Sequence, residues 1–282
     1  MYKVVRRKAL RPTVTQLEIE APLVARKAKP GQFIILRVNE EGERIPLTVA
    51  GVNPEEGTVK IIFQVVGATT ELLNHVEEGG YLQDFVGPLG NPTETEGIKK
   101  VCIVGGGVGC AIAMPVAQEF HRIGAEVTSI IGFRSEDLVI LEDEFNECSD
   151  TLYVMTDDGS YGRHGNVTVP LDEMLAAGEK FDMIITIGPL IMMKFVTLTA
   201  KKYDAPITVS MSPIMIDGTG MCGGCRLTLN TPEGPVMKFA CVDGPDFNGY
   251  EVDFDEAISR GRMYLEYERE AHEEVCNLFK MA

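Results

Sequence analysis

A glycine run, Gly105-Gly106-Gly107-Val108-Gly109, separates an apolar stretch from a helical stretch in "KKVCIVGGGVGCAIAMPVAQEFHRIG", residues 99–124. This order predicts a buried strand, a glycine loop and a helix. Strand-like and helical stretches then alternate as far as residue 212. Because such alternation is typical of parallel strands joined by helices, we expect an open α/β sheet in this part of the chain.

Residues 1–98 have a different pattern. Short β-rich stretches such as "GQFIILRV" and "GTVKIIFQVV" are separated by Pro-Gly, Glu-Gly and Asn-Pro turns, and only "TTELLNHV" is clearly helical. Several short strands at this spacing predict a small antiparallel barrel. The expected fold class is therefore a β barrel followed by an α/β domain with an open parallel sheet.

The 282 residues are sufficient for two domains and an appendage. We predict a barrel at residues 1–98 and an α/β domain at residues 99–212. Residues 213–250 are rich in Gly and Pro and hold three of the seven cysteines, and residues 251–282 are expected to form one charged helix.

The net charge of −16 argues against nucleic-acid binding, which needs an excess of Lys and Arg. No apolar run reaches the roughly 18 residues of a membrane span, and the basic N-terminal stretch lacks the apolar core of an export signal. We therefore expect a cytoplasmic protein without nucleic-acid or membrane partners. In a reducing compartment, clustered cysteines indicate metal binding more often than disulfides.

The glycine loop is a candidate nucleotide-binding site, because backbone amides and a helix dipole at such a position suit a pyrophosphate. Cys110 occupies the third glycine position of the dinucleotide fingerprint, and a purely structural turn is the alternative. Arg134 and Ser135 follow the second strand of the domain. Arg134 could pair with the 2′-phosphate of NADP or contact the adenine and ribose of NAD, so the sequence leaves the choice between NAD(H) and NADP(H) open.

The cysteine segment reads "DGTGMCGGC" from Asp217 to Cys225, and Cys241 follows in "FACVDGP". Plant-type [2Fe–2S] clusters use C-x4-C-x2-C with a distant fourth cysteine. Asp217 stands in the place of the first cysteine, so the predicted ligands are Asp217, Cys222, Cys225 and Cys241. A carboxylate carries the same charge as a thiolate and completes the set. Structural zinc and free thiols are the alternatives.

The stretch "RIPLT", residues 44–48, resembles the flavin motif of the ferredoxin–NADP reductase superfamily, Arg-x-Tyr/Pro-x-Ser/Thr. The resemblance implies that Arg44 binds the flavin pyrophosphate. It also implies that Thr48 lies near the flavin N5, where hydride is exchanged, and makes Thr48 the catalytic candidate. Pro46 and Leu47 complete the motif, although Leu47 replaces an aromatic residue that stacks on the flavin in many members.

Three further segments extend this resemblance. One matches the second flavin segment, where a helix N-terminus meets the phosphates, and two match loops that lie beside the nicotinamide, although Ile187 replaces a cysteine of the family pattern. The residues implied are Gly67, Thr69 and Thr70 for FAD, and Asp157, Asp158, Gly159, Gly188 and Pro189 for the nicotinamide nucleotide.

From the barrel through the cysteine segment, the chain resembles the iron–sulfur flavoprotein electron-transfer subunits of the dihydroorotate dehydrogenase type. Because Asp217 stands in the place of the first cysteine, the chain is more similar to the small subunits of NADH-dependent reduced ferredoxin:NADP+ oxidoreductases. This resemblance implies FAD, a [2Fe–2S] cluster and an NAD(H) site. It also implies a heterodimer with a larger flavin and iron–sulfur subunit, which couples NADH and reduced ferredoxin to NADP+ reduction or bifurcates electrons in the reverse direction.

Two other interpretations stay open. The chain could serve another dehydrogenase, such as dihydroorotate dehydrogenase or a sulfide dehydrogenase or hydrogenase-type complex, or it could be a zinc- and nucleotide-binding module without turnover. The remaining cysteines are expected to pack, and the histidines show no ligand spacing; these residues are Cys102, Cys110, Cys148, Cys276, His75, His121, His164 and His272.

Overall fold

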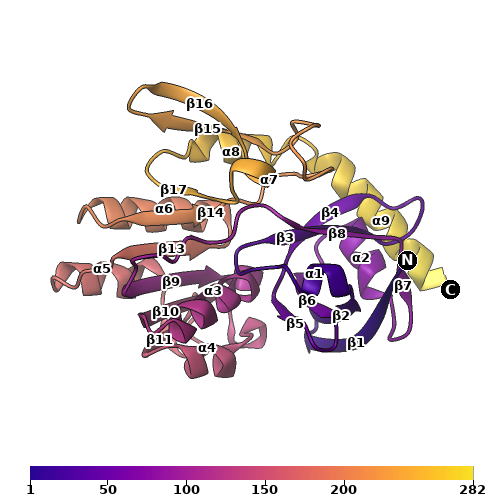
Figure 1. Cartoon of the computed structure of the whole chain (residues 1–282), viewed down its shortest axis with the longest axis horizontal. Coiled ribbons are helices and arrows are strands. Elements are labelled where there is room, and N and C mark those ends of the chain that lie inside the picture. Colours follow the sequence, from indigo (N-terminus) through magenta and orange to yellow (C-terminus); the bar gives the residue numbers. More distant parts are fainter. Residues whose placement is uncertain (282) are drawn as a thin grey trace.

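A computed structural model describes residues 1–281 and arranges them as a β barrel, an α/β domain, a hairpin segment and two C-terminal helices (Figure 1). The predicted combination of a barrel and an α/β domain is confirmed. Among the described residues, no helix is both long enough and apolar enough to cross a membrane.

The barrel consists of two antiparallel sheets whose apolar side chains face a common interior. In sheet order, the first contains β5 (Gly51–Asn53), β6 (Thr58–Gln64), β2 (Val14–Glu20), β1 (Tyr2–Arg11) and β7 (Tyr81–Leu82), and the second contains β4 (Arg44–Thr48), β3 (Phe33–Arg37) and β8 (Asp84–Leu89). The short helices α1 (Pro22–Ala25) and α2 (Ala68–Asn74) belong to this part.

The α/β domain has a seven-stranded sheet, and six of its strands run parallel. In sheet order these are β12 (Arg163–His164), β11 (Thr151–Thr156), β10 (Glu126–Phe133), β9 (Lys100–Gly106), β13 (Met183–Ile187) and β14 (Ile207–Ser210). The helical elements are η1 (Gly107–Gly109), α3 (Cys110–Arg122), η2 (Glu136–Leu138), α4 (Glu142–Cys148), α5 (Thr168–Ala176) and α6 (Leu190–Lys201).

The cysteine segment contributes a strand to this sheet, which the sequence did not indicate. Its hairpin, β15 (Arg226–Thr231) and β16 (Gly234–Phe239), is followed by α7 (Ala240–Asp243) and β17 (Asp246–Asn248). The last strand pairs antiparallel with β14, so the sheet has one antiparallel edge. A three-residue strand beside Gly and Pro has no period that sequence reasoning could detect.

The expectation of one C-terminal helix was wrong. The structure has α8 (Phe254–Arg260), capped by the Asp253 carboxylate that accepts from the Glu256 amide at 2.9 Å, and then α9 (Leu265–Met281). Gly261 caps α8 at its C-terminal end, because glycine weakens helix continuation. The second helix, α9, packs against α2 of the barrel.

The two faces of the seven-stranded sheet carry separate apolar cores. On the face covered by α3 and α4, Phe120 and Phe145 are completely buried. The core of the other face continues into the hairpin segment and reaches Phe33 and Ile35 of β3. One apolar core therefore links the sheet, the cysteine segment and the barrel.

Replacing Phe120 by Ala removes a fully buried ring and should lower the free energy of unfolding by about 3–5 kcal/mol. The matched control is Phe195→Ala, because Phe195 is 54% exposed on α6 and its loss should cost no more than about 0.5 kcal/mol. Urea unfolding, monitored by far-ultraviolet circular dichroism, measures the free energy of unfolding of both variants. Equal effects of the two substitutions would contradict this assignment of the core.

Candidate cofactor site

The predicted flavin motif forms β4, the edge strand of its sheet, which accommodates Pro46 because an edge strand can lack one amide donor. Arg44 begins the strand with its side chain 47% exposed, and its Nη2 lies 3.5 Å from Asp84 Oδ2. Arg37 Nε lies 2.8 Å from the same oxygen. Asp84 thus holds a cation at the start of the motif while leaving part of it accessible to an anionic ligand.

The second predicted flavin segment lies at the start of α2. The Thr70 hydroxyl accepts from the amides of Val66 and Gly67, each at 3.0 Å, and donates to the Gly67 carbonyl at 2.9 Å. Thr70 therefore shapes the turn, and any phosphate contact from it would use its backbone amide. Thr69 is buried, whereas a Cβ at Gly67 would have no heavy atom within 4 Å.

The glycine loop and the Gly188–Pro189 loop, which are distant in sequence, are in direct contact. A Cβ at Gly109 would lie 2.6 Å from the Ile187 carbonyl oxygen, and one at Gly188 would lie 3.1 Å from the Gly106 carbonyl oxygen. Because these neighbours are backbone atoms, neither position can accommodate a side chain without a shift. Gly107 adopts φ 56°, which turns the chain into η1, where Val108 lies.

Backbone hydrogen bonds also connect the chain at the end of β10 to the residues that follow β11. The amides of Asp157 and Asp158 donate to the carbonyls of Phe133 and Arg134 at 3.0 and 3.2 Å. The Asp158 carboxylate accepts from the Ser160 hydroxyl and amide, and these hydrogen bonds lower its pKa. Since β9, β10, β11 and β13 are parallel, the structure gathers the predicted nucleotide residues on one edge of the sheet.

Two acidic residues beside this edge were not selected from the sequence. Glu136 and Asp137 lie in η2, directly after Arg134 and Ser135. The Ser160 hydroxyl accepts from the Glu136 amide at 2.8 Å, and the Ser135 hydroxyl donates to Asp137 at 2.5 Å. A carboxylate at the end of a second strand suits ribose hydroxyls. The signal was present as "RSED", but its first carboxylate, Glu136, stands three residues beyond the end of β10.

Asp217 is held by the backbone of its own loop. The amides of Thr219 and Cys222 donate to Asp217 Oδ1 at 2.6 Å and Oδ2 at 2.7 Å, and these bonds lower the pKa of the carboxyl group. The amide of Gly224 donates to Cys222 Sγ at 3.4 Å. The loop therefore places an ionised carboxylate next to an exposed thiol.

The other two cysteines form a close pair. Cys225 and Cys241 are buried, and their sulfur atoms lie 3.1 Å apart. Burial, followed by the hydrogen bond with Cys225, raises the pKa of Cys241 to about 12. A hydrogen bond from the Gly220 amide acts in the opposite direction. The structure thus pairs Asp217 with Cys222 and Cys225 with Cys241.

The cysteine loop packs directly on the barrel. Gly218 is buried with φ 76°, and a Cβ there would lie 2.6 Å from Leu89 Cδ1 and 2.8 Å from Ile35 Cδ1. Ile35 of β3 is paired with Pro46 of the flavin motif. The residue that follows Asp217 therefore contacts the strand next to β4, which sets the predicted cluster ligands close to the predicted flavin strand.

Comparison with known proteins agrees with this arrangement. Residues 212–253 match the iron–sulfur cluster binding domain of dihydroorotate dehydrogenase B. The electron transfer subunit homolog of dihydroorotate dehydrogenase B (NAD(+)) from Thermotoga maritima is 47% identical over 97% of this chain and 95% of its own length.

A chain in the solved structure of the NADH-dependent reduced ferredoxin-NADP oxidoreductase, studied for flavin-based electron bifurcation, is 44% identical with a TM-score of 0.89, and 97% of each chain is covered. Amycolatopsis cytochrome P450 reductase GcoB shares the fold with a TM-score of 0.61 at 20% identity, covering 72% of this chain and 65% of its own. The predicted resemblance is confirmed: this chain belongs to the family of dihydroorotate dehydrogenase B electron transfer subunits, with a ferredoxin–NADP reductase-like fold.

Proposed function

We propose that this chain is an oxidoreductase subunit that exchanges hydride between NAD(H) and FAD and passes single electrons through a [2Fe–2S] cluster. The observation that carries the proposal is the contact of Gly218 with Ile35 and Leu89. It fixes the cluster loop one strand away from the flavin motif. When bound, FAD supplies hydride exchange together with one-electron transfer, and the cluster carries single electrons.

The residues present fit FAD. Arg44 is a cation positioned by Asp84 and still half exposed, which suits a pyrophosphate. Gly67 opens a helix next to free space, so the amides of Thr69 and Thr70 would receive the phosphates. Thr48 ends β4 and would offer its hydroxyl to the flavin ring, with Leu47 and Pro46 on the same strand.

The residues at the sheet edge fit a dinucleotide. Glycines 105–107 and 109, with Val108, would let backbone amides approach the pyrophosphate, and Gly188 and Pro189 would lie beside the nicotinamide. Arg134, Ser135 and the loop of Asp157, Asp158 and Gly159 would surround the adenosine part. The carboxylates of Glu136 and Asp137 favour NAD(H), because they would repel a 2′-phosphate.

The four ligands fit a [2Fe–2S] cluster in chemistry and spacing. Cys225 and Cys241 would bind one iron, because their sulfur atoms already lie 3.1 Å apart, and Asp217 with Cys222 would bind the other. The amides of Gly220 and Gly224 point at sulfur atoms, as backbone donors do around such clusters.

A larger flavin and iron–sulfur subunit is the proposed partner, forming a heterodimer that exchanges electrons with ferredoxin and NADP+. The similarity to the NADH-dependent reduced ferredoxin-NADP oxidoreductase supports this choice. The second candidate function is electron transfer in a dihydroorotate dehydrogenase, which the similarity to dihydroorotate dehydrogenase B proteins favours. A cytoplasmic location stays a prediction from the sequence.

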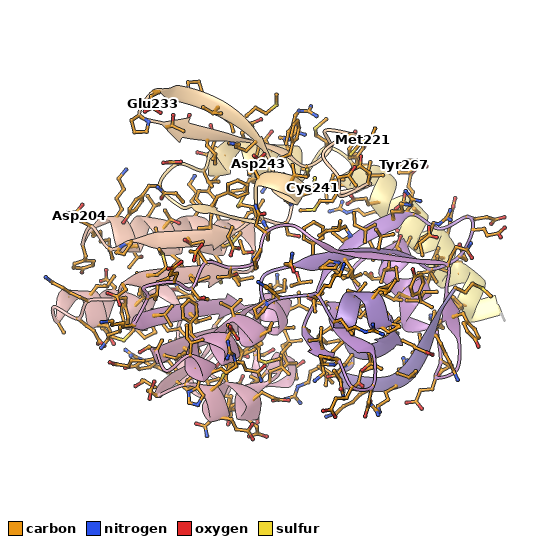
Figure 2. All side chains as sticks on the ribbon, viewed as in Figure 1. Asp204, Met221, Glu233, Cys241, Asp243 and Tyr267 are labelled. Carbon is orange, nitrogen blue, oxygen red and sulfur yellow. The ribbon has the colours of Figure 1, made fainter. Side chains whose placement is uncertain are left out.

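Exposed apolar residues mark the surface where this partner would bind. Met221 is 88% exposed within the cysteine loop, and Ile216 and Val242 beside it are 52% and 44% exposed. Tyr267 of α9 is 69% exposed, and Figure 2 shows Met221, Cys241 and Tyr267 on the same side of the view. Burial of such side chains by another subunit would bring that subunit to the cluster.

Asp217→Ala should lower iron from about two per chain to less than about one, because three thiolates leave one iron short of a ligand. Asp217→Cys should keep the iron and shift the electron paramagnetic resonance signal of the reduced cluster. Glu233→Ala is the control, since Glu233 lies in the exposed turn of the β15–β16 hairpin (Figure 2). Full iron content in Asp217→Ala would remove Asp217 from the ligand set.

Gly109→Ala should raise the KM for NADH by about tenfold or more while flavin content stays unchanged, because the methyl group displaces the loop from Ile187 and Gly188. The control is Gly261→Ala, at a similar φ but with no heavy atom closer than 3.5 Å to the added Cβ. Steady-state reduction of an artificial electron acceptor gives both KM values. An unchanged KM for Gly109→Ala would place the nucleotide elsewhere.

Met221→Asp should abolish co-purification with the co-expressed larger subunit, because it would bury a charge in the interface. The control is Leu198→Asp, which should leave association intact because Leu198 is 47% exposed on α6 of the α/β domain. Iron content and NADH-dependent reduction of an artificial acceptor should match the parent in both. Intact association of Met221→Asp would exclude this surface.

A further inference from the structure

Ligand-type side chains meet where α9 crosses α2, away from the proposed cluster (Figure 1). Glu71 comes from α2, and His272 and Cys276 come from α9. A Glu71 carboxylate oxygen, a His272 ring nitrogen and Cys276 Sγ all lie within 4.8 Å of one another. The two α9 residues are four positions apart, so they share one face of the helix. The sequence indicates no ligand spacing for the histidines and predicts that Cys276 packs, whereas the structure brings His272 and Cys276 together with Glu71.

The helix contact is held in register by a second pair. His75, the C-cap residue of α2, follows Glu71 by four residues, and its ring stacks on Phe279 of α9 with centroids 3.6 Å apart and an interplanar angle of 2°. His75 Nδ1 lies 2.9 Å from the Glu71 carbonyl oxygen. The stack therefore places the faces that carry Glu71 and His272 opposite each other.

The His272 Nε2 atom is buried and has no hydrogen-bond partner in the part of the chain that the structure describes. Glu71 Oε2 lies 3.8 Å away, which is too long for a hydrogen bond. Nε2 is thus buried close to the Glu71 carboxylate without a hydrogen bond to it. The His272 side chain is still 32% exposed, so an ion can reach it from solvent.

These three donors suit a divalent cation of the zinc type. Zinc binds His, Cys and carboxylate at about 2.0–2.3 Å in tetrahedral geometry, which places neighbouring ligand atoms roughly 3.3–3.8 Å apart. The separation of His272 Nε2 and Glu71 Oε2 is 3.8 Å, which is a few tenths of an ångström wider than a nitrogen–oxygen ligand pair on zinc and would close when the ion binds. One thiolate and one carboxylate also neutralise the two positive charges of the ion. A magnesium or calcium ion would instead select oxygen ligands.

We propose that Glu71, His272 and Cys276 bind a zinc-type divalent cation that fastens the C-terminal helix to the barrel, with water in the fourth position. The ion joins segments about 200 residues apart in sequence. It would also hold α2, whose first residues are the proposed flavin phosphate segment. The proposed site depends only on the contact between α2 and α9 and is independent of the proposed electron-transfer function.

The test uses the full chain with FAD and cluster loaded, so that the cluster ligands are already occupied by iron. After equilibration with zinc and passage over a chelating resin, the parent should retain about one zinc per chain. Cys276→Ser and His272→Ala should each retain less than about a fifth of this amount. Glu274→Gln, an exposed carboxylate of the same helix, is the matched control and should retain the parent amount.

Zinc-edge X-ray absorption on the parent separates this site from zinc bound at the cluster residues. The proposed site requires one sulfur ligand with nitrogen and oxygen ligands, whereas the cluster residues would give three sulfurs. Zinc should also slow amide hydrogen exchange in α9 of the parent but not of Cys276→Ser. Parent protein that retains no zinc, a three-sulfur spectrum, or equal zinc in the parent and both variants would overturn the proposal.

Discussion

The contact of Gly218 with Ile35 and Leu89 determines how the cysteine segment is placed on the barrel. It depends on a left-handed backbone conformation and on the absence of a side chain, both of which glycine supplies. Packed interiors do not deform continuously, so a contact of this kind fixes the distance between the Asp217 loop and the flavin strand. The atoms that meet are the Gly218 backbone and the side-chain ends of Ile35 and Leu89, which pack in the core shared by the sheet and the cysteine segment.

Further bonds fix the same segment from the other side. The Asn91 amide donates to the Gly244 carbonyl at 2.7 Å, and the Thr93 hydroxyl donates to Asp246 Oδ2 at 2.7 Å. Burial raises the pKa of the Asp246 carboxyl, so this group belongs to the interior of the fold. Strand β17 then joins the seven-stranded sheet. The cysteine segment is therefore held between barrel and sheet, and the three candidate cofactor sites cannot move independently.

The sequence predicts features that depend on local pattern. The alternation after Lys99, the glycine loop, and the spacing from Asp217 to Cys225 each need only neighbouring residues, and fold class and family are confirmed. Features that depend on tertiary contact were missed. The strand β17 is too short to show a period, and the site of Glu71 and His272 forms only because α9 crosses α2. The spacing H-x3-C was visible, but its one partner in the proposed site, Glu71, lies about 200 residues earlier in the chain, in α2 of the barrel.

The ligands of the proposed cluster are prepared in different ways. Asp217 is ionised in advance, because two backbone amides lower its pKa, and those amides also withdraw charge from its oxygens. Cys241 is buried with a raised pKa, so its thiolate forms only when a metal replaces the proton. Asp217 and Cys222 lie on the exposed side, whereas Cys225 and Cys241 face the core that continues to the sheet. With these ligands the two irons of the proposed cluster would have unequal surroundings, a polar one toward the proposed partner surface and an apolar one toward the interior. Such asymmetry is a means of tuning reduction potential through ligand type and burial.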